Sequence, residues 1–317
     1  MAGAGAFSSV TSQDPSEIAR LLCRAHQDGA EIDFQRTDRK LWFMAISFLI
    51  DHAMLDAANY AASRAAPIYP TAGFLQSTAA VLARLPAPCD DAVFVGFCDD
   101  PTQEVQIVPR KGATAALLGF CGRAKRMGMS LNLIQRWFGR LGVHVIYLRD
   151  LQARNYDNGV RSLAPDLGGT LRALRAAIDD LGVERVVCYG NSLGGYGALR
   201  YALELQCEAT LCFASPTNLE PGFGNFLLRD QRGVAPGLNL RPLYQKAERA
   251  PRTHLVFSEH HAYDRAQAAN FAGLPSVSLE MARGEQGHDV FLNALLQGRY
   301  ERLIQWLVDP GRGAGVP

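Results

Sequence analysis

The fold is decided by the stretch Val186-Val187-Cys188-Tyr189-Gly190-Asn191-Ser192-Leu193-Gly194-Gly195-Tyr196-Gly197-Ala198-Leu199. A short apolar run rich in β-branched residues stops at Gly190, a serine follows two residues later, and further glycines lead into a helical pattern. The pattern predicts a strand, a sharp turn and a helix, with Ser192 at the turn. Cβ atoms at Gly190 and Gly194 would clash across so tight a turn. The strained backbone of the serine lifts its hydroxyl above the sheet edge, where the next helix begins with unpaired N–H groups.

The pattern Gly-x-Ser-x-Gly is weak evidence when taken alone, because a glycine-rich chain contains it by chance. The alternative interpretation is a glycine-rich strand-to-helix turn without chemistry. The flanking strand and helix favour the catalytic interpretation. That interpretation requires a base, an acid and an oxyanion site elsewhere in the chain.

Composition limits the classes of function. The 317 residues are 48% hydrophobic and 20% charged, as in ordinary soluble globular proteins, and the net charge is +1. Such a balance gives no field that attracts nucleic acid or an anionic membrane. No apolar run approaches the ~20 residues that span a bilayer, and the start does not have the pattern of a secretory signal.

Seven cysteines form no Cys-x-x-Cys pair, and their odd number suggests a reducing, cytoplasmic compartment. His260 and His261 are adjacent, so in any regular element they point in different directions. The sequence therefore predicts no metal site.

Four regions are expected. Residues 1–14 form a flexible start, 15–88 a helical region, 89–310 an α/β domain with a lid insertion at about 216–250, and 311–317 a flexible tail. In the α/β domain, strands are expected at 92–98, 105–108, 114–120, 144–148, 186–190, 209–214, 253–258 and 276–281. Helices are expected at 130–141, 166–181, 195–205 and 291–308. This alternation predicts a mostly parallel sheet covered by helices on both faces.

The helical region resembles one tetratricopeptide repeat. Trp42, Ala58, Ala65 and Pro70 have the spacing of its signature tryptophan, its two small inter-helix residues and its terminal proline. A further helix is expected at 71–85. A single repeat is unstable alone, so the resemblance implies docking to the α/β domain, to a protein partner or to a second copy of the chain. The alternative is a generic helical hairpin that caps the domain.

The order of Ser192, Asp264 and His288 resembles that of the α/β-hydrolase superfamily, over roughly residues 90–310. The resemblance implies an α/β-hydrolase fold in which the nucleophile follows the fifth strand, the acid the next-to-last strand and the histidine the last. Ser192 is the expected nucleophile, and His288 is the expected base, since the imidazole pKa lies near neutrality. Asp264 is expected to orient the ring. Glu259 is an alternative acid because it lies nearer the strand.

The oxyanion site is expected to use two backbone N–H groups, those of Leu193 and Arg123. The second belongs to the loop after the strand 114–120, where Cys121-Gly122 replaces the common His-Gly pair. Cys121 is also a thiol that could react, although no histidine is assigned to it.

The substrate is expected to contact Cys121, Gly122 and Asn191 around the serine, together with Phe223 and Phe226 from the lid insertion. Arg123, Lys125 and Arg126 cluster beside this site. They form either a solvated surface or a cationic subsite for a polar or anionic part of the substrate.

The sequence thus predicts a serine hydrolase that cleaves an ester or thioester through an acyl-serine, without a cofactor. The substrate is a small-molecule, carrier-linked or glycan acyl ester. Two alternatives remain open: an acyltransferase that uses the same triad, and a catalytically silent interaction protein that binds through its N-terminal helices.

Overall fold

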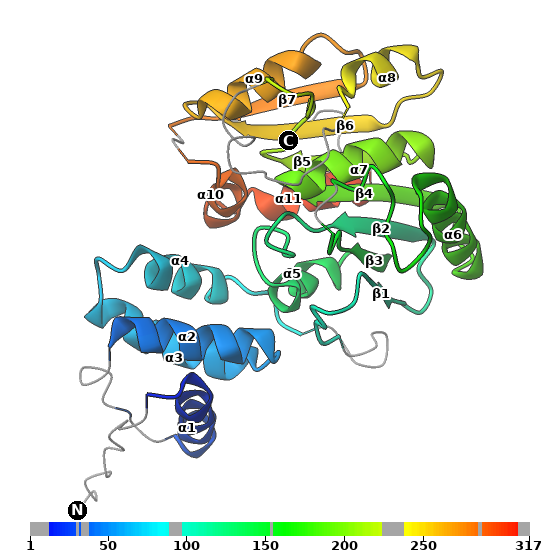
Figure 1. Cartoon of the computed structure of the whole chain (residues 1–317). Helices are drawn as coiled ribbons and strands as arrows, with labels where there is room; N and C mark the ends of the chain where they lie inside the picture. Colours follow the sequence, from blue (N-terminus) through cyan, green and yellow to red (C-terminus); the bar gives the residue numbers. More distant parts are fainter. Residues whose placement is uncertain are drawn as a thin grey trace, which may run out of the picture. The chain divides into compact units, whose positions relative to one another are not determined.

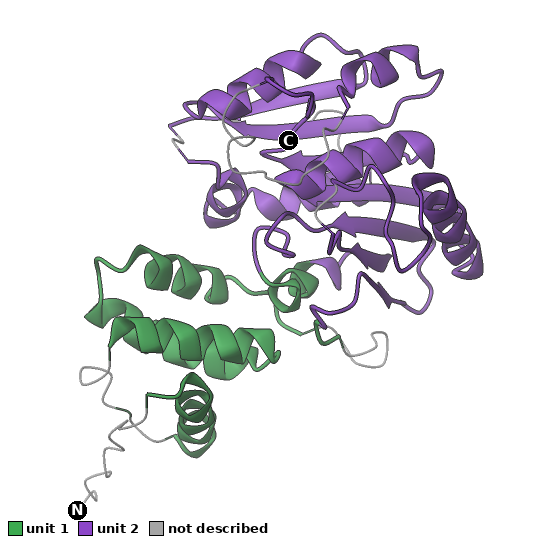
Figure 2. Ribbon diagram, viewed as in Figure 1, with its two compact units in different colours: residues 1–88, 97–99, 130–137 green, residues 89–96, 100–129, 138–317 purple. Residues whose placement is uncertain are grey.

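The computed structural model describes residues 13–29, 32, 38–88, 97–152, 155–223, 238–284 and 287–309. The chain divides into two compact units (Figure 2). Unit 1 holds residues 1–88, 97–99 and 130–137, and unit 2 holds residues 89–96, 100–129 and 138–317. Most of the strand expected at 92–98 lies outside the described residues, as do nearly all of the two expected tails.

Unit 1 contains helices α1 (Pro15–Asp28), α2 (Arg39–Asp51), α3 (Leu55–Ile68) and α4 (Gly73–Leu82). The first helix has clear boundaries: the Asp14 carboxylate accepts the Ser16 N–H at 2.9 Å, and Gly29 ends the helix in the left-handed conformation.

Trp42, Ala58 and Ala65 are fully buried among these helices, which is the burial that closely packed helix pairs require. The likeness to a tetratricopeptide repeat stays a prediction. Unit 1 also takes in part of helix α5 (Leu131–Phe138): the Asn132 amide donates to the carbonyls of Ile50 and Asp51, at 2.9 and 3.0 Å.

Unit 2 is built on one seven-stranded sheet with the order β1-β3-β2-β4-β5-β6-β7 (Figure 1). Only β1 is antiparallel to its neighbour, and the other six strands run parallel. The strands are β1 (Val105–Val108), β2 (Ala115–Phe120), β3 (His144–Leu148), β4 (Arg185–Asn191), β5 (Ala209–Phe213), β6 (Arg252–Ser258) and β7 (Val277–Ala282). The remaining helices are α6 (Leu167–Asp180), α7 (Leu193–Glu204), α8 (Arg241–Lys246), α9 (Ala262–Phe271), α10 (Val290–Leu296) and α11 (Tyr300–Val308).

The inner strands of the sheet are buried on both faces, and successive residues of a strand point to opposite faces. On one face, Phe120 and Cys188 join a core with buried residues of α6, α7, α8 and α9. On the other, Phe213 packs edge-on against Phe291 of α10, and Tyr189 against Tyr300 of α11. The predicted mostly parallel sheet with helices on both faces is confirmed.

The single closing helix expected at 291–308 is wrong. The structure has α10 and α11 in its place, because Gly298 adopts a left-handed φ of +71° and ends the first of them. The N–H groups of Gly298 and Arg299 bond back to Leu295 and Ala294 at 3.0 and 2.9 Å, as in a helix C-terminus. The helical periodicity continues across this glycine, so the pattern alone hid the break.

The first residues of the expected lid insertion belong to the protein core. Thr217 is fully buried, and its N–H and hydroxyl both bond to Gln267 of α9, at 2.6 and 2.8 Å. Residues 224–237 lie outside the described part, and α8 follows them. None of the helices that the structure describes is both long and apolar enough to cross a membrane.

Candidate active site

A sheet with this strand order, and with a serine at the tight turn after its central strand, has the α/β-hydrolase fold, as predicted. In that fold the carboxyl ends of the parallel strands carry the chemistry. The turn after β4, the segment after β6 and the loop after β7 all lie at this edge. They carry Ser192, Asp264 and His288.

Ser192 has φ 51° and ψ −129°, a conformation that residues with a Cβ rarely adopt. Glycines around it permit the turn. A Cβ on Gly194 would lie 2.1 Å from the carbonyl oxygen of Phe120, and a Cβ on Gly190 would lie 2.5 Å from the Cα of Gly195. The strand, turn and helix therefore approach one another so closely that only glycine fits.

The three predicted side chains meet in one chain of hydrogen bonds. The Ser192 Oγ lies 3.0 Å from Nε2 of His288, and the Nδ1 of the same ring lies 2.8 Å from Oδ1 of Asp264. A carboxylate can only accept, so Nδ1 carries the proton. The neutral ring then presents the lone pair of Nε2 to the serine hydroxyl. This is the arrangement needed for a base to take the hydroxyl proton.

Asp264 lies in the first turn of α9 and is fully buried. Its Oδ2 accepts the Ser258 N–H at 3.1 Å. Its Oδ1 accepts a second imidazole, the Nδ1 of His261, at 3.0 Å. Three donors thus orient this carboxylate: one from β6, one from the residue that precedes α9 and one from the loop before α10.

Sequence reasoning missed His261 because it considered this residue only beside its neighbour His260. The available signal was the spacing to Asp264. A residue at the start of a helix and a residue three positions later lie on the same helix face.

Glu259 does not act on the ring. Its carboxylate accepts the Gly284 N–H at 2.9 Å and lies 3.5 Å from Nε2 of His260. Asp289 occupies the position before α10. Among the described residues, neither carboxylate bonds to His288, so Asp264 is the one that holds it.

The loop after β2 is fixed by its own hydrogen bonds. The N–H of Cys121 donates to Leu148, that of Gly122 to Arg126, and that of Lys125 to Gly122, at 2.8 to 2.9 Å. No hydrogen bond of the described residues uses the N–H of Arg123. A Cβ on Gly122 would lie 3.8 Å from the Ser192 Cβ, so this loop runs beside the serine.

The predicted substrate-contacting residues have different positions. Cys121 is only 2% exposed, and its carbonyl accepts the Tyr156 hydroxyl at 2.8 Å. Asn191 and Gly122 are half-buried next to the serine. Phe223 is half-buried in a turn closed by its N–H to the Glu220 carbonyl. Phe226 lies outside the described residues.

The predicted basic cluster is partly built into the fold. The Lys125 ammonium donates to the main-chain carbonyl of Asp150, and burial lowers the pKa of this lysine. Arg123 and Arg126 extend from the same loop.

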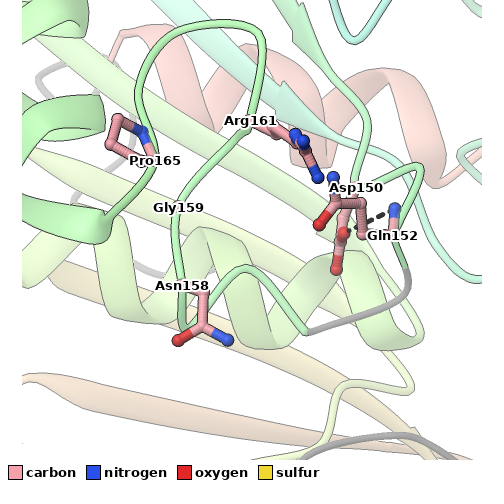
Figure 3. A pocket seen from close by; sticks show the side chains of 6 residues that line it. All are labelled: Asp150, Gln152, Asn158, Gly159, Arg161 and Pro165. Atoms are coloured by element: carbon pink, nitrogen blue, oxygen red, sulfur yellow. Dashed lines mark hydrogen bonds between the residues drawn. The ribbon is translucent and has the colours of Figure 1, made fainter.

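A cavity of about 300 Å³ opens beside the loop between β3 and α6 (Figure 3). Polar side chains line part of it, and the Gln152 N–H bonds to the Asp150 carboxylate at 3.1 Å. The lining residues are Asp150, Gln152, Asn158, Gly159, Arg161 and Pro165. None of them belongs to the predicted substrate-contacting set.

Comparisons with solved structures find likeness of backbone at low identity. MenH from S. aureus matches 67% of this chain and 100% of its own, at 12% identity and a TM-score of 0.46. The capsule O-acetyltransferase of Neisseria meningitidis serogroup A matches 70% of this chain and 99% of its own, at 14% identity and a TM-score of 0.46. The match to carboxylesterase CesB (YbfK) from Bacillus subtilis covers 74% of this chain and 97% of CesB, at 14% identity and a TM-score of 0.46. No protein-family model matches the sequence, and no curated protein matches it.

Proposed function

We propose that this protein is a serine hydrolase that cleaves an ester or thioester through an acyl-serine intermediate. The observation that carries the proposal is the unbroken chain from the Ser192 hydroxyl through His288 to Asp264, with contacts of 3.0 and 2.8 Å. Serine is a weak nucleophile at neutral pH and needs such a base.

The reaction has two halves. The Ser192 Oγ attacks the acyl carbon while its proton passes to Nε2 of His288. When the bond to the leaving group breaks, the same proton goes to the departing alkoxide or thiolate, which leaves an acyl-serine. Water then attacks the acyl carbon and gives its proton to Nε2. Release of the acid returns that proton to the serine oxygen.

Asp264 keeps the imidazole in the productive tautomer and balances the charge that the ring gains. Full burial strengthens this electrostatic support, because little solvent screens it. The proton stays on Nδ1 throughout.

We assign the oxyanion site to the N–H groups of Leu193 and Arg123. Leu193 is the first residue of α7, so its N–H has no partner within the helix. In the loop after β2, the N–H groups of Gly122 and Lys125 are engaged, which favours Arg123 as the second donor.

An acyltransferase is the second candidate. One of the similar structures is named an O-acetyltransferase and another a carboxylesterase. Both activities use an acyl-enzyme and differ in whether water or an alcohol takes the acyl group. The triad geometry does not distinguish hydrolysis from acyl transfer.

A fluorophosphonate probe tests the proposal. We expect it to label the full-length chain, and Ser192→Ala to abolish labelling, while Ser162→Ala, which removes a hydroxyl from an exposed serine, labels as the wild type does. p-Nitrophenyl esters of increasing acyl length, with and without an added alcohol, then separate free acid from a new ester. Failure of the wild type to label, together with no turnover of any ester, would refute the proposal.

A further inference from the structure

Two histidines share one oxygen atom of the triad carboxylate. His261 and His288 each place Nδ1 on Oδ1 of Asp264, at 3.0 and 2.8 Å. One ligand atom from each of the three side chains lies within 4.8 Å of the other two. Two imidazoles and one carboxylate are a ligand set that suits Zn²⁺, Co²⁺ and related ions.

We propose that His261, Asp264 and His288 form a binding site for a divalent transition-metal ion, principally Zn²⁺, and that the bound ion inactivates Ser192. The inactivation rests on the proposed function. The binding of the ion does not.

The geometry is close to that of a metal site. Ligand atoms of a tetrahedral zinc ion lie about 2.0–2.2 Å from the metal, hence about 3.2–3.5 Å from one another. The two nitrogen-to-oxygen separations, 2.8 and 3.0 Å, need to open by about half an ångström. One ligand atom of each of the three side chains lies within 4.8 Å of those of the other two, so the set needs to close by no more than about 1.5 Å. Rotation of partly exposed rings supplies such a shift.

The surroundings support both the carboxylate and the entry of an ion. Asp264 keeps its Oδ2 bonded to the Ser258 N–H, and outer contacts of this kind orient a metal-binding carboxylate. The side chains of His261 and His288 are 21% and 29% exposed, so an ion can arrive from solvent and keep a water as its fourth ligand.

The ion would remove the catalytic base by changing its tautomer. A metal takes the lone pair of Nδ1, so the proton of neutral His288 moves to Nε2, and the same exchange occurs in His261. No net proton is released, and the charge of Asp264 offsets part of the charge of the ion. The Nε2–H of His288 then donates to the Ser192 hydroxyl and has no lone pair to accept its proton.

His261→Asn is the matched variant. The amide nitrogen of asparagine occupies nearly the position of Nδ1 and still donates to Asp264, but it has no lone pair for a metal. The variant keeps every other histidine and cysteine of the chain, so metal bound elsewhere cancels in the comparison. It therefore separates metal binding from the orientation of the triad.

The test uses metal-free full-length protein. We expect Co²⁺ to bind the wild type with the visible absorption of a tetrahedral site at one ion per chain, and His261→Asn to bind at least about tenfold more weakly. We expect saturating Zn²⁺ to slow fluorophosphonate labelling of the wild type about 100-fold, the size of a lost general base. A chelator should restore the rate, and labelling of His261→Asn should be insensitive to the same Zn²⁺ concentration.

Absence of the Co²⁺ spectrum in the wild type, or an equal spectrum in His261→Asn, overturns the metal site whether or not the protein is a hydrolase. If the wild type binds the metal as expected and saturating Zn²⁺ does not slow its fluorophosphonate labelling, the proposed inactivation is wrong. A wild type that binds Co²⁺ in a His261-dependent way and never labels would refute the proposed function alone.

Discussion

The backbone strain at Ser192 predicts that, of two substitutions that both destroy activity, the one to glycine leaves the more stable protein. The residue has φ 51° and ψ −129°, a conformation that glycine adopts readily and that is strained for any residue with a Cβ. Replacing Ser192 by glycine removes both the hydroxyl and the strain. Replacing it by alanine removes the hydroxyl and keeps the strain, so the difference between the two variants isolates the backbone term.

The magnitude follows from two opposing effects. A residue held in so sparsely populated a region costs on the order of 1–3 kcal/mol, which Ser192→Gly recovers. Glycine also gives the unfolded chain more freedom, which costs about 0.4–1 kcal/mol. Both variants lose the 3.0 Å contact with His288 equally. We expect Ser192→Gly to exceed Ser192→Ala in unfolding free energy by about 0.5–2 kcal/mol.

The assay is equilibrium unfolding in urea, followed by far-ultraviolet circular dichroism, with fluorophosphonate labelling of the same samples. Both variants should fail to label, and their urea slopes should agree, so that the difference in midpoint reports stability alone. A glycine variant that is equal to or less stable than the alanine variant would show that the turn is not strained. The argument from the elbow geometry would then fail.

Three further outcomes are expected. Gly194→Ala places a Cβ 2.1 Å from a main-chain carbonyl oxygen, so activity should fall at least about tenfold and stability by about 1–3 kcal/mol; Gly168→Ala, whose Cβ meets nothing closer than 3.5 Å, should keep both. Burial raises the pKa of Asp157 from 3.8 to about 6, so the native state binds more protons between these values and stability falls as pH rises through them. As pH rises from about 4 to 7.5, the unfolding free energy of Asp157→Asn should increase by about 1–2 kcal/mol relative to that of the wild type, a figure discounted for the partial exposure of Asp157. If the difference in urea midpoint between variant and wild type is the same at both pH values, this prediction is wrong. Asp264→Asn should lower kcat for p-nitrophenyl ester hydrolysis about 10³–10⁴-fold, while Glu259→Gln leaves it unchanged; comparable losses would mean that the acid is misassigned.

The elbow could be predicted because its cause is local. A strand that ends at Asn191 and a helix that begins at Leu193 leave one compact way to connect them, and glycine is needed wherever the two segments touch. The order of strands and helices also gave the parallel sheet, because each buried strand reads as a short apolar run. The break in the last helix escaped prediction, since the apolar periodicity on both sides of Gly298 suits one continuous helix.

The meeting of two imidazoles at Asp264 could not be predicted in the same way. The contact of His261 with the carboxylate follows from the spacing of three residues at the start of α9, but its proximity to His288 depends on where the chain returns after β7. The ring centroids of the two histidines lie 5.3 Å apart although the residues are far apart in sequence. Only the assembled sheet edge brings them together.

The loop that supplies the proposed oxyanion donor is held in place by a residue that is distant from it in the sequence. Arg149, fully buried directly after β3, donates from Nε to the Lys125 carbonyl at 3.2 Å and from Nη1 to the Gln103 carbonyl at 3.1 Å. Its planar group can hold both carbonyls in fixed directions, which an ammonium on a flexible stem cannot do. Electrostatic catalysis requires donors that are oriented before charge develops, so the proposed oxyanion site would depend on the buried guanidinium that fixes this loop.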